Sequence, residues 1–470
     1  MHSVKALSVI TLSLALAACD MAPKYVRPQL AVPAASPQGP AYGAGNGLGS
    51  GAAIVPADTA WRDFFTDARL ARVIETALAN NRDLRVALAN VEQARAQYRV
   101  QRADLLPGVS AGGTATYQDS PFSLAGSGRT DLYQAQVGVS AWEVDLFGRV
   151  RNLSTAAQEQ YFASVETRNA AQTALIAETA NAWLTMAADQ ERLRIARDLE
   201  QAFGETLELN RARFAKGIAS ELEVRQAQTS YDAARSTIAE TTTLVAQDQN
   251  ALNLLAGTTV PATDLPESFP AADPTIDNLP GNIASDVLLR RPDIASAEHQ
   301  LLSANANIGA ARAAFFPNIS LTAAFGSISL GLSNLFGSGS SFWSVAPTAS
   351  PPIFDFGKNK GNLAYAKATY DAMLATYEKS VQTGFREVAD ALARRGTMGQ
   401  QLEAQMSQRD AARVAYTLSE ARFRAGVDGF LTTLDSQRAL SNAEQSLLAT
   451  RLTRASNMVE LYRAMGGGLK

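Results

Sequence analysis

The feature that most constrains this fold is a tandem duplication. Residues 213–228 (RFAKGIASELEVRQAQ) resemble residues 422–440 (RFRAGVDGFLTTLDSQRAL), and Phe423 lies 209 residues after Phe214. Four further matches keep this offset to within a residue: 81–83 with 291–293, 106–107 with 316–317, 145–148 with 355–357, and Gly257 with Gly466. Each copy is far longer than the roughly 20–50 residues of a solenoid repeat. The chain is therefore an internally duplicated domain.

The duplication also sets the domain boundaries. We expect a first structural repeat at residues 58–257 and a second at 283–466. A linker rich in Pro and Asp, at 258–282, joins them, and residues 467–470 form a C-terminal tail.

Each copy contains one long and one shorter helical pattern with a glycine between them. The four patterns cover residues 149–215, about 359–424, about 220–256 and about 430–465. Gly217 and Gly426 lie where each pair reverses direction, and glycine accepts the left-handed backbone conformation that such a stop requires. The sequence therefore predicts two helical hairpins with these glycines at their tips.

The second long pattern has the spacing of a coiled coil. Its apolar residues step by three and four: Tyr370, Leu374, Tyr377, Val381, Phe385, Val388 and Leu392. The returning helices are shorter than their partners. We therefore expect the helical patterns at 83–105 and 293–314 to pack beside the uncovered part of each long arm, with a further helix at 67–79.

Each copy also contains two strand-like stretches. They are predicted at about 108–118, 130–145, 318–331 and 341–354. In the second of them Tyr133, Ala135, Val137, Val139 and Ala141 alternate with small or polar residues. Alternation over about ten residues is typical of membrane-barrel strands. The same pattern also fits a surface hairpin on a soluble domain.

Four such strands do not close a barrel within one chain. In lipid, an open sheet edge leaves backbone N–H and C=O groups unpaired, at a cost of several kcal/mol each. If these are barrel strands, the chain must oligomerise. Two copies give about eight strands, whose side chains fill the interior, whereas three give about twelve and leave a passage.

The N-terminus has the layout of a targeting segment. Residues 1–18 read as a signal peptide, with a Lys before a short apolar run and small residues at its end. Cys19 follows directly and is the only cysteine in the chain. This arrangement resembles a bacterial lipobox, in which the cysteine is acylated; the alternative is a chance cysteine. Residues 19–57, rich in Ala, Pro and Gly, would then be a lipidated N-terminal tether.

Several classes of function are disfavoured by composition. The chain has two histidines, of which His299 lies inside a helical pattern and reads as structural. A single cysteine and no His pair argue against a metal site or a catalytic triad, and no phosphate-binding glycine motif follows a strand. We therefore expect no catalytic residues, no cofactor and no enzyme activity. A net charge of −3 without a basic stripe argues against nucleic acid as a partner.

Taken together, these residues resemble one family, the outer-membrane factors, or TolC-like channels, and most closely its lipoprotein branch serving multidrug efflux pumps. The most specific segments are RAGVD at 424–428, LTTLDSQR at 431–438 and MGGG at 465–468. The resemblance implies a mainly α fold with membrane β-structure. Three chains, with four strands each, would form a 12-stranded outer-membrane β-barrel, continued by a long α-helical coiled-coil barrel.

The resemblance also implies a function and partners. The protein would be the passive exit duct of a tripartite efflux system, carrying drugs or other small molecules across the periplasm and the outer membrane. It would be a lipid-anchored homotrimer in the outer membrane, served by a periplasmic adaptor (a membrane fusion protein) and an inner-membrane efflux pump. The alternatives are a periplasm-spanning coiled-coil structural lipoprotein and a secretion duct for a peptide or protein.

By this resemblance, Leu431, Asp435 and Arg438 narrow the inner end of the duct. Spacings of four and three place them on one helix face. The alternative interpretation is an ordinary solvated face. Asp428 stands where other branches carry a basic residue, and Glu223 is the first-copy counterpart of a position where they carry an acid. Both are further aperture candidates, and a closing network built from those branches' salt bridges is not expected here.

Overall fold

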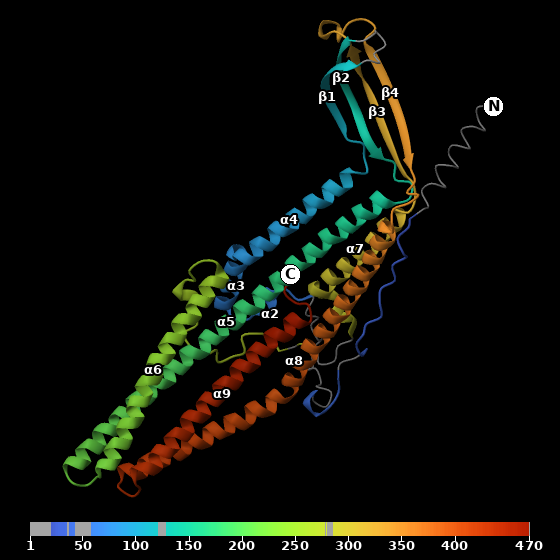
Figure 1. Ribbon diagram of the computed structural model, residues 1–470. Helices are drawn as coiled ribbons and strands as arrows, with labels where there is room; N and C mark the ends of the chain where they lie inside the picture. The colour runs from blue at the N-terminus through green and yellow to red at the C-terminus, as the bar shows by residue number, and fades with distance from the viewer. Residues whose placement is uncertain are drawn as a thin grey trace. The chain divides into compact units, whose positions relative to one another are not determined.

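The computed structural model describes residues 20–34, 37–42, 58–120, 128–277, 279 and 285–469. The predicted signal peptide and Cys19 lie outside these residues, as does most of the predicted tether. The chain divides into two compact units, each with segments from both copies (Figure 1). The sheet unit comprises Met1–Gln29, Ala89–Val165 and Ser296–Lys379; the hairpin unit comprises Leu30–Leu88, Glu166–Ala295 and Ser380–Lys470.

Helices make up most of the described chain. The α-helices are α2 (Trp61–Phe64), α3 (Ala68–Asn80), α4 (Arg82–Ala103), α5 (Arg149–Ala215), α6 (Glu221–Ala256), α7 (Pro292–Ala313), α8 (Lys358–Arg424) and α9 (Phe430–Ala464). Short 3₁₀ turns are η1 (Pro40–Tyr42), η3 (Ala262–Asp264), η4 (Ser285–Arg290) and η5 (Leu332–Asn334). The long helices α5 and α8 and the returning helices α6 and α9 follow the sequence patterns to within a residue.

The ends of these helices follow from local chemistry. The Asp67 carboxylate accepts hydrogen bonds from the backbone N–H groups of Arg69 and Leu70, in the first turn of α3, at 2.8 and 3.3 Å. Gly257 ends α6 in the left-handed conformation, with φ 66°. On α8, the predicted seam is the covered face: Tyr377, Val381, Val388 and Leu392 are buried.

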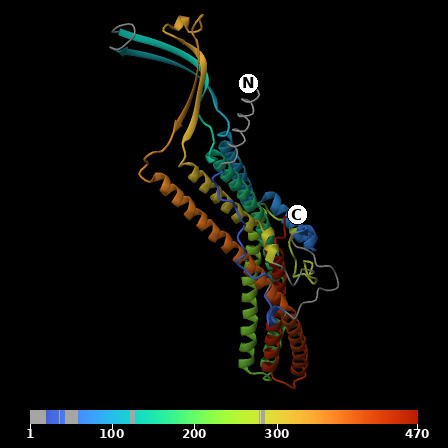
Figure 2. The same cartoon turned by 90° about the vertical axis from the view of Figure 1, so that its right-hand side faces the viewer.

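The four strands form one antiparallel sheet in the order β1-β2-β3-β4. Figure 1 labels the strands, and Figure 2 shows the same sheet turned by 90°. The strands are β1 (Val109–Ser120), β2 (Gly128–Glu143), β3 (Asn318–Ser329) and β4 (Ser341–Ser350). The central pair, β2 with β3, joins the two copies of the duplication. Strands β1 and β4 each have a neighbour on one side only within this sheet.

One detail of the predicted strand pattern is wrong. The register between β2 and β3 shifts by one residue between Val139, opposite Ala323, and Trp142, opposite Leu321. Ala141, expected on the apolar face, adopts φ 50° at this bulge, and its N–H bonds the Thr322 hydroxyl at 3.1 Å. An extra residue in one strand reverses the alternation beyond it, so Trp142 takes the place opposite Leu321.

The sheet has two chemically different faces. Cross-strand partners share a face, and one face presents apolar side chains, among them Val109, Val137, Phe325, Trp343 and Val345, which are 50–76% exposed. The opposite face includes Ser110, Thr114, Gln134, Gln136 and Ser344. Such a division is typical of a sheet with lipid on one side and water on the other.

Two glycines on the polar face allow neighbouring strands to approach closely. A Cβ at Gly326 would collide with the Ala135 carbonyl oxygen and lie 2.7 Å from the Cα of Gln136. A Cβ at Gly138 would collide with the Ala323 carbonyl oxygen. The sheet therefore bends toward its polar face at the β2–β3 pair, which places the apolar face on the convex side.

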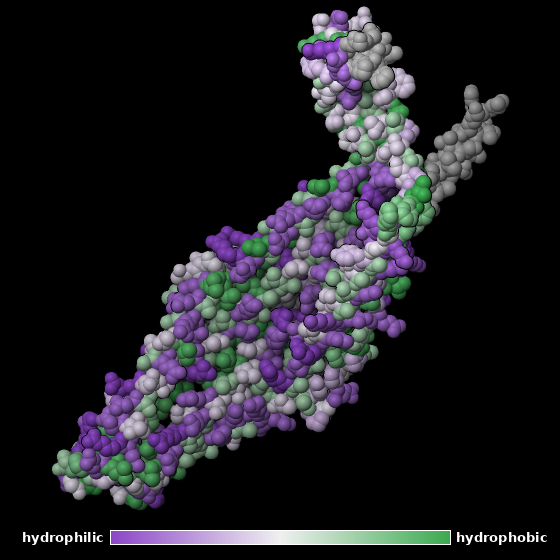
Figure 3. All heavy atoms as spheres, in the orientation of Figure 1, coloured by the Kyte–Doolittle hydropathy of each residue, from purple (hydrophilic) through white to green (hydrophobic). Residues whose placement is uncertain are grey.

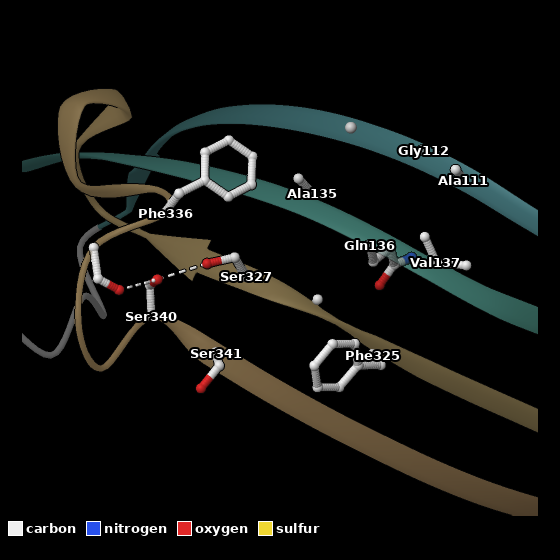
Figure 4. A pocket seen from close by; sticks show the side chains of 13 residues that line it. Ala111, Gly112, Ala135, Gln136, Val137, Phe325, Ser327, Phe336, Ser340 and Ser341 are labelled. Atoms are coloured by element: carbon white, nitrogen blue, oxygen red, sulfur yellow. Dashed lines mark hydrogen bonds between the residues drawn. The ribbon is translucent and has the colours of Figure 1, made fainter.

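The connection between β3 and β4 folds onto the apolar face. The Ser327 hydroxyl donates to the Leu335 carbonyl and lies 2.6 Å from the Ser340 hydroxyl. Phe336, 82% exposed, stands over a shallow pocket of about 740 Å³ whose floor includes Ala135, Val137 and Phe325 (Figure 4). This connection thereby extends the apolar surface of the sheet.

We predict that Gly326→Ala destabilises the sheet, because the added methyl group meets backbone that cannot rotate away. The expected cost is about 1–3 kcal/mol, seen as a lower midpoint for thermal loss of β-structure. The matched control is Gly112→Ala, two strands away in the same cross-strand row, where no atom lies within 4 Å of the added Cβ. Equal midpoints for the two variants would contradict the close approach.

Candidate channel aperture at the hairpin tips

Both hairpins reverse at a glycine. Gly217 and Gly426 have φ of 67° and 74°, and no atom lies within 4 Å of a Cβ built at either. Backbone conformation, rather than space, therefore requires glycine at each tip. Each turn is closed by two backbone hydrogen bonds: Gly217 N–H to Phe214 O and Ile218 N–H to Arg213 O, both 2.9 Å, and Gly426 N–H to Phe423 O (3.0 Å) and Val427 N–H to Arg422 O (2.9 Å).

The first tip is secured by a capping box. The Ser220 hydroxyl accepts from the Glu223 N–H at 3.3 Å, and the Glu223 carboxylate accepts from the Ser220 N–H at 2.7 Å. The candidate aperture acid Glu223 therefore caps the start of helix α6 in this structure.

The second tip is secured by an ion pair. Helix α9 begins after Gly429, which offers no side-chain cap. Instead, the Arg422 guanidinium donates two hydrogen bonds to Asp428, at 2.6 and 2.9 Å. The hydrogen bond from Arg422 lowers the pKa of the Asp428 carboxyl. The candidate aperture acid Asp428 is therefore engaged within its own turn.

The remaining candidates share the outward face of α9. Phe430, Leu434 and Gln437 are buried, whereas Leu431, Asp435 and Arg438 are exposed. Among the described residues, neither Asp435 nor Arg438 has an ion-pair or hydrogen-bond partner. The face of α9 that carries these three residues is thus free to contact solvent, an ion or another copy of the chain.

The two hairpins pack together behind this face. Their common core is formed by Phe203, Leu207, Ala227, Ala234, Phe423, Phe430 and Leu434. The Arg213 guanidinium lies 4.9 Å from the centre of the Phe423 ring, which adds a cation–π contact between α5 and α8. Sequence reasoning missed this contact, because the two Arg-Phe pairs read as equivalent. Phe423 is buried, whereas its counterpart Phe214 is 47% exposed.

Sequence reasoning also missed a pair of acids between α5 and α6. Asp189 is buried and forms an ion pair with Arg192. Burial, followed by the hydrogen bond and charge of Asp189, raises the pKa of Asp248 to about 6. One Asp248 carboxylate oxygen is buried with no partner among the described residues. A proton on Asp248 would let it donate to Asp189.

The described residues show neither a metal cluster nor a helical membrane span. No group of three or more His, Cys, Asp and Glu side chains is placed to hold an ion within them. His299 Nδ1 instead lies 2.7 Å from Glu159 Oε2. None of the described helices combines the length and apolar composition needed to cross a membrane.

A duplicated pair of long helical hairpins, joined to a two-faced four-stranded sheet, defines a class of channel protein. The family model for outer membrane efflux proteins matches residues 73–258 and again residues 283–467, one match per copy. The chain belongs to the outer membrane efflux protein family and is the outer-membrane channel component of an efflux pump. It is a channel protein and not an enzyme.

Curated relatives match the sequence of this chain along nearly its whole length. The probable efflux pump outer membrane protein TtgC of Pseudomonas putida is 44% identical over 465 residues, which cover 98% of this chain and 95% of that protein. The outer membrane protein OprJ of Pseudomonas aeruginosa is 40% identical over 464 residues, with coverages of 98% and 95%.

Solved structures agree on the fold. A membrane protein from Pseudomonas aeruginosa superposes with a TM-score of 0.88 at 38% identity, covering 95% of this chain and 100% of that one. The open state of the MtrE outer membrane channel of Neisseria gonorrhoeae gives 0.84 at 37% identity, covering 96% and 99%. The predicted mainly α fold with four strands and an internal duplication is confirmed.

We predict that Asp248 makes the hairpin unit less stable above about pH 6. Its pKa is higher in the folded chain than the roughly 3.9 of an unfolded Asp, so its favourable contribution is complete below about pH 4 and is lost as pH rises through 6. In Asp248→Asn, the melting temperature of the helices should depend less on pH between pH 4 and pH 6. The control is Glu240→Gln, an exposed acid on the same helix. An unchanged pH slope in Asp248→Asn would contradict the assignment.

Proposed function

We propose that three copies of this chain form a continuous exit duct through the outer membrane and into the periplasm. The observation that carries this proposal is the four-stranded sheet with two open edges, an exposed apolar convex face and a polar concave face. If β1 of one copy pairs with β4 of the next, every edge in lipid is satisfied. Three copies then give about twelve strands, enough for an open lumen lined by the polar face.

The cargo class follows from the relatives' names. Relatives of this chain are named as toluene, solvent and antibiotic efflux pump outer membrane proteins. We propose that this chain passes similar small apolar or amphipathic molecules, delivered by a periplasmic adaptor and an inner-membrane pump. The duct itself provides no chemistry. Deletion of its gene should raise sensitivity to such compounds, and the gene should restore tolerance when supplied in trans; unchanged sensitivity would contradict this role.

We further propose that the chain is anchored by a lipid on Cys19 in addition to its strands. The residues that follow Cys19 are fixed within the sheet unit. Asp20 Oδ1 accepts from the Asn152 side chain of α5 at 2.9 Å. Asn305 and Arg312 of α7 donate to backbone carbonyls of Pro23 and Met21, at 2.9 and 3.2 Å. This segment would hold a lipid close to the folded chain.

We predict that Cys19→Ala, secreted with a cleavable signal, still reaches the outer membrane as a trimer. A diacylated Cys19 would be one lipid anchor, which binds a bilayer less firmly than twelve membrane strands would. The fractionation of membranes and periplasm, followed by cross-linking, checks this. Recovery of the variant as a soluble periplasmic protein would mean that the lipid is the main anchor.

We also propose that Asp435, with Leu431 and Arg438 on either side, forms the narrowest ring of the resting duct. The support is the exposed face of α9 just past the second tip, where Asp435 and Arg438 lack partners within the described chain. Glu223 and Asp428 are weaker candidates, because the capping box and Arg422 already engage them. Three carboxylates around one axis favour cations.

We predict that Asp435→Ala lowers cation selectivity and weakens block by a divalent cation added on the periplasmic side. Single-channel recording in planar bilayers checks both properties. Asp428→Ala is the matched control, because its carboxylate is held by Arg422. Leu431→Ser should raise leakage by wetting the neighbouring apolar ring. If Asp428→Ala rather than Asp435→Ala changes selectivity, the constriction lies at the turn.

A further inference from the structure

A groove with its own chemistry lies between α5, α6 and α9 within the hairpin unit. Its volume is about 370 Å³, at the lower end of the range for small-molecule sites. Its apolar wall is formed by Ala196, Leu199, Phe203, Ala233 and Ala234. Seven further lining residues carry hydroxyl or amide groups: Thr229, Ser230, Thr237, Thr241, Ser441, Asn442 and Gln445.

The charges that line this groove have one sign. Arg192 reaches it from α5 and Arg438 from α9, and no acid is among its lining residues. Arg192 shares its charge with Asp189, which lies outside the lining. Arg438 has no ion-pair partner among the described residues. The groove therefore favours an anion over a cation.

The hydroxyl groups of the groove differ in whether they already donate a hydrogen bond. Thr229, Thr237 and Thr241 each donate to a carbonyl of their own helix, at 2.8–3.1 Å. Ser230, only 5% exposed, has a buried hydroxyl with no partner among the described residues. A buried hydroxyl without a partner is uncommon, since it forfeits a hydrogen bond. An acceptor entering the groove would satisfy it.

We propose that this groove binds a small amphipathic carboxylate, such as a medium-chain fatty acid. The carboxylate is an acceptor-only anion and matches Arg438 and the Ser230 hydroxyl. The alkyl chain matches the wall of Leu199, Phe203 and alanines. A free phosphate would leave that wall uncovered, and an alcohol of equal length would leave Arg438 unpaired. All the lining residues belong to one chain, and Arg438 is the one residue that the groove shares with the proposed aperture.

Photo-crosslinking tests this directly. The purified full-length protein in nanodiscs is labelled with a diazirine-bearing decanoic acid, and the labelled peptides are mapped by mass spectrometry. We expect labels on the α5 and α6 segments that form the apolar wall. Decanoate should compete for them, whereas decanol and decyltrimethylammonium should not. Equal competition by decanol would overturn the carboxylate assignment.

Two variants test separately whether binding depends on the charge of Arg438 and on the open volume of the groove. Arg438→Gln should require about tenfold more decanoate for the same competition, because a charged hydrogen bond is lost. Ala233→Leu, at an exposed helical position facing the groove, should abolish the labelling by filling it. Arg451→Gln, on the same helix but outside the groove, is the control. Unchanged labelling in both Arg438→Gln and Ala233→Leu, with melting curves like the parent's, would overturn the proposal.

Discussion

The open edges of the sheet are the constraint on which the rest of this structure depends. Strands β1 and β4 each lack a neighbour on one side, and the sheet carries exposed Phe325 and Trp343 on its convex face. Water would hydrate such edges, but lipid would not, so the proposed trimer would couple membrane insertion to self-association. The bend at Gly138 and Gly326 adds curvature of the sign that closure requires.

Duplication supplies the framework, and divergence between the copies makes the two hairpin tips different. Both tips keep the glycine turn, yet one is held by the Ser220–Glu223 capping box and the other by the Arg422–Asp428 ion pair. Phe423 is buried beneath Arg213, whereas Phe214 is exposed. The two hairpins therefore present different groups at their ends. Among the described residues near the tips, only α9 exposes an unpaired acid and an unpaired arginine.

Local pattern was enough to predict the helices and strands, because their periodicity and their glycine and proline boundaries are encoded within each segment. It failed at Ala141, where the bulge depends on how β2 pairs with β3, nearly 180 residues away. The Asp189–Asp248 pair and the groove at Ser230 were not predicted for the same reason: each needs side chains from separate helices. Nothing in the sequence distinguishes Phe214 from Phe423, since both follow an arginine and precede a glycine turn.

The number of chains in the membrane-extracted protein tests this account most directly. The protein is extracted in mild detergent, cross-linked with increasing reagent and analysed by native mass spectrometry. The account predicts that cross-linking stops at three chains and that the trimer keeps its β-structure. A single chain that remains folded in detergent, with all four strands intact, would contradict the claim that the sheet edges are satisfied by neighbouring copies.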